Sequence, residues 1–212
     1  VAAMVLPPRE GFGPGRTGAV GLLLRRLGRA GTFSPVVIGM ALGAPFDGVA
    51  FRAAALSRLP GKLSWRYARG VARVLRSLRP ALIEVHNRPD IALYLARRFP
   101  AVPVCLVLHN DPQRMRRARS AAQRAGLLRR LALVVTVSDW LRTRMQDGVA
   151  GEVAVLPNCL DLADIPASPA ERELVLLFAG RVVADKGADA FVAACALSLP
   201  RLPGWRAEMS GA

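Results

Sequence analysis

The sequence predicts an α/β protein built on parallel sheets, with strands and helices alternating along the chain. Short unbroken apolar runs, such as 102–108 and 174–178, suit strands that are buried on both faces of a parallel sheet. Between such runs, apolar residues recur at helical spacing, as at Val71, Val74 and Leu75. Polar residues follow directly after several strands, where sheets of this kind bind ligands. These three observations favour a doubly wound α/β architecture.

The individual elements follow from apolar periodicity and from the glycines and prolines that interrupt it. The expected strands are 1–6, 34–38, 49–51, 81–85, 102–108, 131–137 and 153–156, then 174–178 and 205–209. The expected helices are 20–27, 66–78, 91–99, 113–130 and 140–146, with Ser138 capping the last, and one more after Gly187. We expect a first domain over 1–160, a proline-containing linker over 161–173, and the start of a second domain over 174–212.

Composition restricts the class of protein. With 212 residues, of which 52% are hydrophobic, the chain can fill a real core. The formal net charge of +15 suggests an anionic partner, either nucleic acid or a membrane surface. Nearly all cations are arginine, however, in a chain rich in Ala, Gly, Pro and Leu, and a GC-rich genome would produce the same bias. Three scattered cysteines indicate a reducing compartment and no zinc site.

No apolar run reaches the roughly 20 residues that span a bilayer, and no signal peptide is visible. We therefore expect a cytoplasmic protein that can rest on the inner face of the membrane.

Two cations flank the turn after the strand 174–178. Arg181 stands at the end of that strand, and Lys186 and Gly187 open the next helix. The amides of a helix N-terminus already favour an anion there. Arginine can donate to two phosphate oxygens while lysine supplies a compact charge, so a diphosphate is the expected ligand. A surface turn with two solvated cations explains the same residues.

A glycine-rich loop follows the first strand. Gly13, Gly15 and Gly18 match the dinucleotide fingerprint, in which glycines let the backbone approach a pyrophosphate. Pro14 removes an amide from this loop, and the next strand ends in Gly39 rather than in a ribose-binding acid. A nicotinamide dinucleotide site is therefore disfavoured, and a tight turn with positive φ accounts for the glycines equally well.

Both histidines of the chain stand at the carboxyl ends of expected strands. His86 and Asn87 follow 81–85, and His109 follows 102–108. Functional residues gather at this edge of parallel sheets. Each histidine is either a site residue or a satisfied cap.

Three stretches resemble family 4 glycosyltransferases of GT-B architecture. FAGRVVADKGADAFVAACALS at 178–198 resembles the opening of the family's second domain, and VVTVSDWLRTRM at 134–145 resembles its strand-Ser-helix unit. Pro157-Asn158-Cys159-Leu160-Asp161 resembles the crossover between the domains, with Cys159 where glycine is usual. The resemblance covers essentially the whole chain, and it implies a Rossmann-like first domain plus the first β-α-β part of a second.

The resemblance implies transfer of a sugar, with retention, from a nucleotide-diphosphate sugar to an acceptor hydroxyl. It implies a role in transfer for His109 and donor diphosphate binding by Arg181 and Lys186. The remaining implied site residues are Gly13, Gly15, Thr17 and Gly18 in the donor and acceptor loop, and His86 and Asn87 lining the cleft. No Asp-x-Asp pair occurs, which fits a reaction without metal or cofactor.

The implied acceptor is a bacterial cell-envelope glycan, such as lipopolysaccharide or another polysaccharide, or a lipid-linked molecule. Contact with anionic membrane would use arginines opposite the apolar face of the helix 66–78, namely Arg66, Arg69, Arg73 and Arg76. A solvated face explains them as well. The basic segment 113–130 has no interleaved aromatic residues, which argues against nucleic acid.

Complete family members continue for about another domain, so we expect this chain to be a fragment that is inactive alone. The rival classes are a nicotinamide-dependent oxidoreductase and a basic binding module for nucleic acid or membrane.

Overall fold

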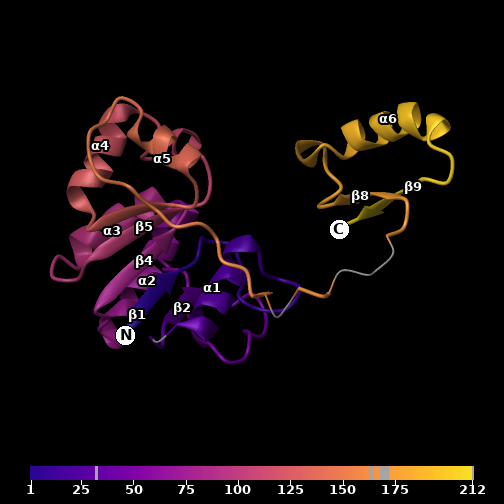
Figure 1. Ribbon diagram of the computed structural model, residues 1–212. Coiled ribbons are helices and arrows are strands. Elements are labelled where there is room, and N and C mark those ends of the chain that lie inside the picture. Colours follow the sequence, from indigo (N-terminus) through magenta and orange to yellow (C-terminus); the bar gives the residue numbers. More distant parts are fainter. Residues whose placement is uncertain (32, 163–164, 168–171, 212) are drawn as a thin grey trace. The chain divides into compact units, whose positions relative to one another are not determined.

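The structure is a computed structural model that describes residues 1–31, 33–162, 165–167 and 172–211 (Figure 1). The chain divides into two compact units, Val1–Leu162 and Ala163–Ala212. Part of the expected linker, at 163–164 and 168–171, lies outside the described residues.

The first unit contains a seven-stranded sheet in which every neighbouring pair is parallel. The strand order is β3-β2-β1-β4-β5-β6-β7. The strands are β1 Ala2–Val5, β2 Val36–Gly39, β3 Ala50–Ala53, β4 Leu82–His86, β5 Val104–Leu108, β6 Leu133–Thr136 and β7 Ala154–Val155. The order reverses between β1 and β4, which is the switch point where such sheets bind ligands. The expected parallel α/β fold is confirmed.

Helices cover both faces of this sheet. They are α1 Ala19–Ala30, α2 Leu63–Leu78, α3 Pro89–Arg98, α4 Ala121–Arg130 and α5 Asp139–Gln146, with the short 3-10 helix η1 Pro112–Arg114. The larger core joins apolar residues of α2, α3, α4 and α5 to one face, and a smaller core joins α1 to the other. Within the described residues, no helix is both long and apolar enough to cross a bilayer.

The arginine face of α2 is less open than the sequence suggests. Arg73 and Arg76 are exposed, whereas Arg66 and Arg69 are half-buried. The Nε–H of Arg66 donates to the carbonyl oxygen of Ser57 at 2.9 Å, which ties the preceding loop to the helix. Two of the four arginines are therefore less accessible to solvent or to a membrane surface than Arg73 and Arg76.

The helix expected over 113–130 is shorter in the structure. It begins at Ala121, because Arg117 has a left-handed φ of 73° and the Ser120 hydroxyl accepts from the N–H of Gln123 at 3.3 Å. Arg124, one of the cations of this basic segment, is only 3% exposed. The cap on the following helix is as expected, since the Ser138 hydroxyl accepts from the N–H of Leu141 at 3.3 Å.

A buried tyrosine connects α2 to the ends of two strands. The hydroxyl of Tyr67 lies 3.0 Å from the carbonyl oxygen of Leu6 and 3.3 Å from that of Ile38, and it donates its one proton to this pair. Burial raises the pKa of Tyr67, so the phenol stays neutral.

Replacing Tyr67 with phenylalanine is expected to lower the free energy of unfolding by about 1–2 kcal/mol, because the buried carbonyl oxygen of Leu6 loses its donor, while that of Ile38 keeps the bond from the N–H of Leu6. Urea denaturation followed by circular dichroism measures the change. Ser77→Ala on the same helix removes an exposed hydroxyl bond to Val74 and is the matched control. A phenylalanine variant as stable as that control would contradict the assignment.

The second unit forms one β-α-β connection. β8 Val175–Ala179 pairs in parallel with β9 Arg206–Ser210, and between them lie η3 Ala184–Lys186, α6 Ala188–Ser198 and η4 Leu199–Arg201. The rings of Phe178 and Phe191, 5.6 Å apart, pack α6 on β8. The strand was expected to be buried on both faces, yet Leu177 is 59% exposed, because in the described part of this unit only one face of β8 carries a helix.

Candidate functional site

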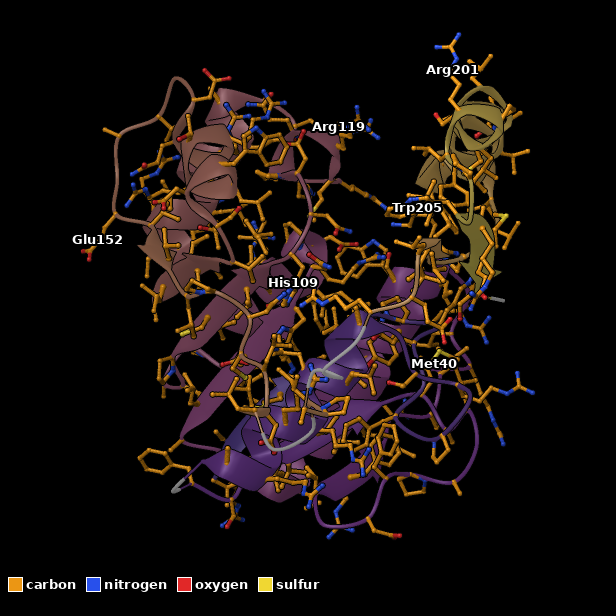
Figure 2. All side chains as sticks on the ribbon, turned by 45° about the vertical axis from the view of Figure 1, so that its right-hand side comes forward. Met40, His109, Arg119, Glu152, Arg201 and Trp205 are labelled. Carbon is orange, nitrogen blue, oxygen red and sulfur yellow. The ribbon has the colours of Figure 1, made fainter. Side chains whose placement is uncertain are left out.

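The candidate site lies at the carboxyl edge of the first unit's sheet. His86 is the last residue of β4. His109, labelled in Figure 2, is the first residue after β5. These strands are direct neighbours, with His86 opposite Val107 in the register. The fold therefore brings together two histidines that are 23 positions apart in the sequence.

Glu84, His86 and His109 form a chain of hydrogen bonds. Oε1 of Glu84 lies 2.7 Å from Nε2 of His86, and Nδ1 of His86 lies 2.9 Å from Nε2 of His109. The two rings are nearly parallel, with centroids 5.3 Å apart. His86 is almost fully buried, at 1% exposed, while Glu84 keeps 22% of its side chain accessible.

The order of these contacts fixes the proton positions when both rings are neutral. An ionised carboxylate only accepts, so Nε2 of His86 carries the proton and Nδ1 of His86 is an acceptor. Nε2–H of His109 then donates to His86, which leaves Nδ1 of His109 with a free lone pair. Burial, followed by the neighbouring His86, lowers the pKa of His109 to about 4, although Glu84 acts in the opposite sense. His109 is therefore neutral at pH 7.

Asn87 holds the backbone of His109. Its Oδ1 accepts from the N–H of His109 at 2.8 Å, and its own N–H donates to the carbonyl oxygen of Val107 at 2.9 Å. Asn87 has a left-handed φ of 54°, a conformation that asparagine adopts more readily than most residues. Three of the predicted site residues, His86, Asn87 and His109, are thus in direct contact.

The glycine-rich loop leaves the carboxyl end of β1 at the same edge of the sheet. Gly13, Gly15, Thr17 and Gly18 all lie in it, and Gly15 has the left-handed φ of 68° that favours glycine. A Cβ on Gly13 would lie 1.9 Å from the carbonyl oxygen of Ala44, so the residue allows a close approach of two backbones.

The N-terminus of α1 already holds a carboxylate. Oε1 of Glu10 accepts from the N–H of Gly21 at 2.7 Å, in the first turn of the helix. A dinucleotide pyrophosphate at this helix end would meet the negative charge of Glu10. This contact disfavours the nicotinamide dinucleotide site further.

In the second unit, Arg181 and Lys186 lie in the connection between β8 and α6. Both side chains are exposed, and Gly187, with a left-handed φ of 76°, is the N-cap of α6 without a side-chain cap. Cations and uncapped amides therefore share one turn. Diphosphate binding at this turn stays a prediction. Among the described residues, no group of three or more His, Cys, Asp or Glu side chains could hold a metal.

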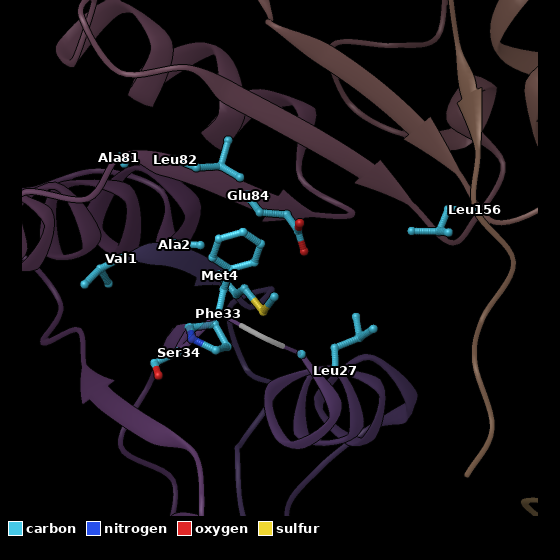
Figure 3. Close-up of a pocket in the computed structure, with 12 residues that line it drawn as sticks. Val1, Ala2, Met4, Leu27, Phe33, Ser34, Ala81, Leu82, Glu84 and Leu156 are labelled. Carbon is cyan, nitrogen blue, oxygen red and sulfur yellow. The ribbon is translucent and has the colours of Figure 1, made fainter. Parts of the chain in front are cut away.

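An apolar cavity of about 570 Å³ lies behind Glu84, on the sheet face beside α1 (Figure 3). Met4, Leu27 and Phe33 line it, and the carboxylate of Glu84 is one of few polar groups on its wall. It also reaches Ala2 and Ala81, at the amino-terminal ends of β1 and β4, so it is distinct from the carboxyl edge.

Sequence reasoning missed Glu84 as a site residue. Residues two apart on a strand share a face, so Glu84 and His86 carry a readable signal in the pattern Glu-x-His. It also missed a group of cations from separate loops, Arg9, Lys62, Arg88 and Arg116, which come together only in the folded chain.

The parallel sheet, the polar groups at its carboxyl edge and the separate β-α-β unit define an α/β protein of the GT-B class. The model of the family described as Glycosyltransferase Family 4 matches residues 20–164. The chain belongs to this family.

Solved structures share the fold at low sequence identity. A glycosyltransferase from Rickettsia africae is 11% identical, with a TM-score of 0.61, over 99% of this chain and 68% of that one. A UDP-GlcNAc 2-epimerase from Methanocaldococcus jannaschii is 11% identical, with a TM-score of 0.53, over 99% and 64%. A Streptomyces sp. SF2575 glycosyltransferase complexed with thymidine diphosphate is 14% identical, with a TM-score of 0.50, over 100% and 68%.

The chain thus spans about two thirds of the length of these proteins. Among curated proteins, none matches it significantly.

Proposed function

We propose that the chain is the acceptor-side domain and the opening of the donor-side domain of a retaining glycosyltransferase. The enzyme would transfer a sugar from a nucleotide-diphosphate sugar to an acceptor hydroxyl. The observation that carries the proposal is the family match over 20–164, which contains the Glu84–His86–His109 chain. The cationic turn at Arg181 and Lys186, within the other unit, adds to it.

The proposed chemistry assigns a separate task to each group. Negative charge develops on the departing diphosphate, and a guanidinium, an ammonium and the free amides of a helix N-terminus stabilise such charge. Arg181, Lys186 and the N-terminus of α6 supply these three groups. His109, neutral at pH 7, offers Nδ1 to accept a hydrogen bond from a sugar hydroxyl and so to orient the sugar. We propose that no metal or cofactor takes part.

The acceptor we propose is a cell-envelope glycan or a lipid-linked molecule, met in the cytoplasm or at the inner face of the membrane. For membrane contact, the exposed Arg73 and Arg76 are better placed than the half-buried Arg66 and Arg69.

The double variant Arg181→Ala/Lys186→Ala is expected to bind UDP at least about tenfold more weakly than the wild type, because two charge-assisted contacts to phosphate are lost. The measurement is the shift of the backbone amides of Gly187 and Ala188 in ¹⁵N NMR spectra during a UDP titration.

The matched control is Arg172→Ala/Arg201→Ala, which removes two exposed cations from the same unit. If both variants bind UDP equally weakly, the loss of net positive charge alone explains the change in affinity. That result would contradict the proposed donor site.

A further inference from the structure

A small cavity at the carboxyl edge of the sheet is lined by four cations from four different segments. Its volume is about 270 Å³. Arg9 follows β1, Lys62 precedes α2, Arg88 follows β4 and Arg116 follows η1. Because β1, β4 and β5 are neighbours in the sheet, the loops that follow them meet at one place.

Most of this positive charge is not neutralised by the protein. Arg88 forms two contacts of 3.2 Å with the carboxylate of Asp90. Within the described part of the chain, Arg9, Lys62 and Arg116 have no carboxylate within ion-pair distance. Cations that converge without counter-charges repel one another, and a bound anion would remove that repulsion.

The first turn of α2 adds two free donors to the same cavity. The backbone N–H groups of Leu63 and Ser64 have no acceptor among the described residues, and both residues line the cavity. Lys62 occupies the N-cap position, but its side chain accepts no hydrogen bond from the helix amides. The first turn of the helix contains no acidic residue. By contrast, α5 is capped by Ser138 and carries Asp139 in its first turn. Two unused amides thus point to the same ligand as the cations do.

We propose that this cavity binds a phosphate group carried by the acceptor. The inference rests on the proposed function, because the bound molecule is an acceptor only if the protein transfers a sugar. Guanidinium, ammonium and amide donors arranged around a small space match the oxygens of one phosphate. The volume is sufficient for a phosphate with a short ester arm. Arg88 follows His86 by two residues, so a molecule held here lies at the same edge as the two histidines.

The first test is a titration with glycerol 3-phosphate, read from the backbone amides of Leu63 and Ser64 in ¹⁵N NMR spectra. We expect both amides to shift and to saturate. The variant Arg9→Ala/Lys62→Ala/Arg116→Ala removes three exposed cations and is expected to weaken binding by at least about tenfold. Lys62→Ala alone is expected to weaken it several-fold, as a second variant with a smaller change.

The matched control is Arg97→Ala/Arg129→Ala/Arg130→Ala, which removes three exposed cations of the same unit away from the cavity. It is expected to retain the wild-type affinity at the same ionic strength. Equal weakening in the control would overturn the inference, as would shifts that leave Leu63 and Ser64 unaffected.

The phosphate could belong to a soluble molecule or to a lipid headgroup, and a second measurement separates the two. Vesicles of phosphatidylcholine with phosphatidic acid are compared with vesicles of phosphatidylcholine alone in a sedimentation assay. Binding to phosphatidic acid that depends on the three cations identifies a lipid acceptor. A response to glycerol 3-phosphate alone identifies a soluble one. The absence of both overturns the inference.

The two proposals can fail separately. If UDP shifts Gly187 while glycerol 3-phosphate has no effect at Leu63 and Ser64, the acceptor phosphate site is wrong and the donor site stands. If glycerol 3-phosphate binds and UDP does not shift Gly187 and Ala188, the phosphate site stands and the proposed diphosphate site at Arg181 and Lys186 is wrong.

Discussion

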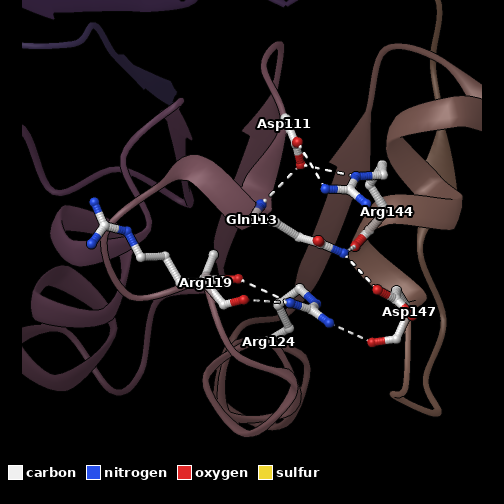
Figure 4. A network of polar contacts seen from close by, with 7 residues as sticks. Asp111, Gln113, Arg119, Arg124, Arg144 and Asp147 are labelled. Atoms are coloured by element: carbon white, nitrogen blue, oxygen red, sulfur yellow. Dashed lines mark hydrogen bonds and ion pairs between the residues drawn. The ribbon is translucent and has the colours of Figure 1, made fainter.

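Replacing Arg124 with methionine is expected to lower the free energy of unfolding by about 3–5 kcal/mol. Arg124 is buried in α4, and its guanidinium donates to four backbone carbonyl oxygens, of which those of Arg119 and Asp147 belong to residues labelled in Figure 4. Nε donates to Met145 at 3.0 Å, Nη1 to Ala118 at 3.3 Å and to Arg119 at 2.8 Å, and Nη2 to Asp147. Methionine keeps much of the apolar contact but leaves these acceptors without a donor.

Urea denaturation, followed by circular dichroism, measures this loss. The matched control is Arg129→Met on the same helix, where the side chain is exposed, and a change within about 0.5 kcal/mol is expected there. A loss below about 1 kcal/mol in Arg124→Met would show that the four carbonyls find other partners, and would contradict this account.

Acidification from pH 7 to pH 4 is expected to remove about 3 kcal/mol of stability through His109 alone. The pKa of His109 is lowered from an ordinary value of 6.5 to about 4 in the folded protein. Between these two values the unfolded chain binds a proton that the folded chain does not. Stability from this group is therefore complete above pH 6.5 and is lost as the pH falls toward 4.

The comparison with His109→Gln isolates this contribution, since other titrating groups act in both proteins. The difference in unfolding free energy between wild type and variant should shrink as the pH falls from 7 to 4.5. The histidine ¹⁵N shifts should show His109 neutral above pH 5, with its proton on Nε2. A pH-independent difference, or titration of His109 near pH 6.5, would contradict the proposed Glu84–His86–His109 chain.

What could be predicted from the sequence depends on how local each contact is. Ser138 caps α5 through an amide three residues away, so the sequence shows it directly. The burial of Arg124 could not be predicted in this way, because the carbonyl groups of Met145 and Asp147 that it contacts belong to the next helix and its end. Its position in a run of arginines carries no sign of that contact.

The candidate site shows the same limit. Each histidine could be found from its place after a strand, whereas their hydrogen bond depends on the register of β4 and β5. The cationic cavity depends on the strand order, which sets Arg9 and Arg88 beside each other although the helix α2 separates them in sequence. Tertiary arrangement, rather than local propensity, decides both features.

The partial exposure of Glu84 gives the histidine pair a second access to water. The carboxylate of Glu84 opens onto the apolar cavity, away from the edge where His109 would meet a ligand. A sugar that covers His109 would therefore leave the far end of the hydrogen-bonded chain in contact with solvent.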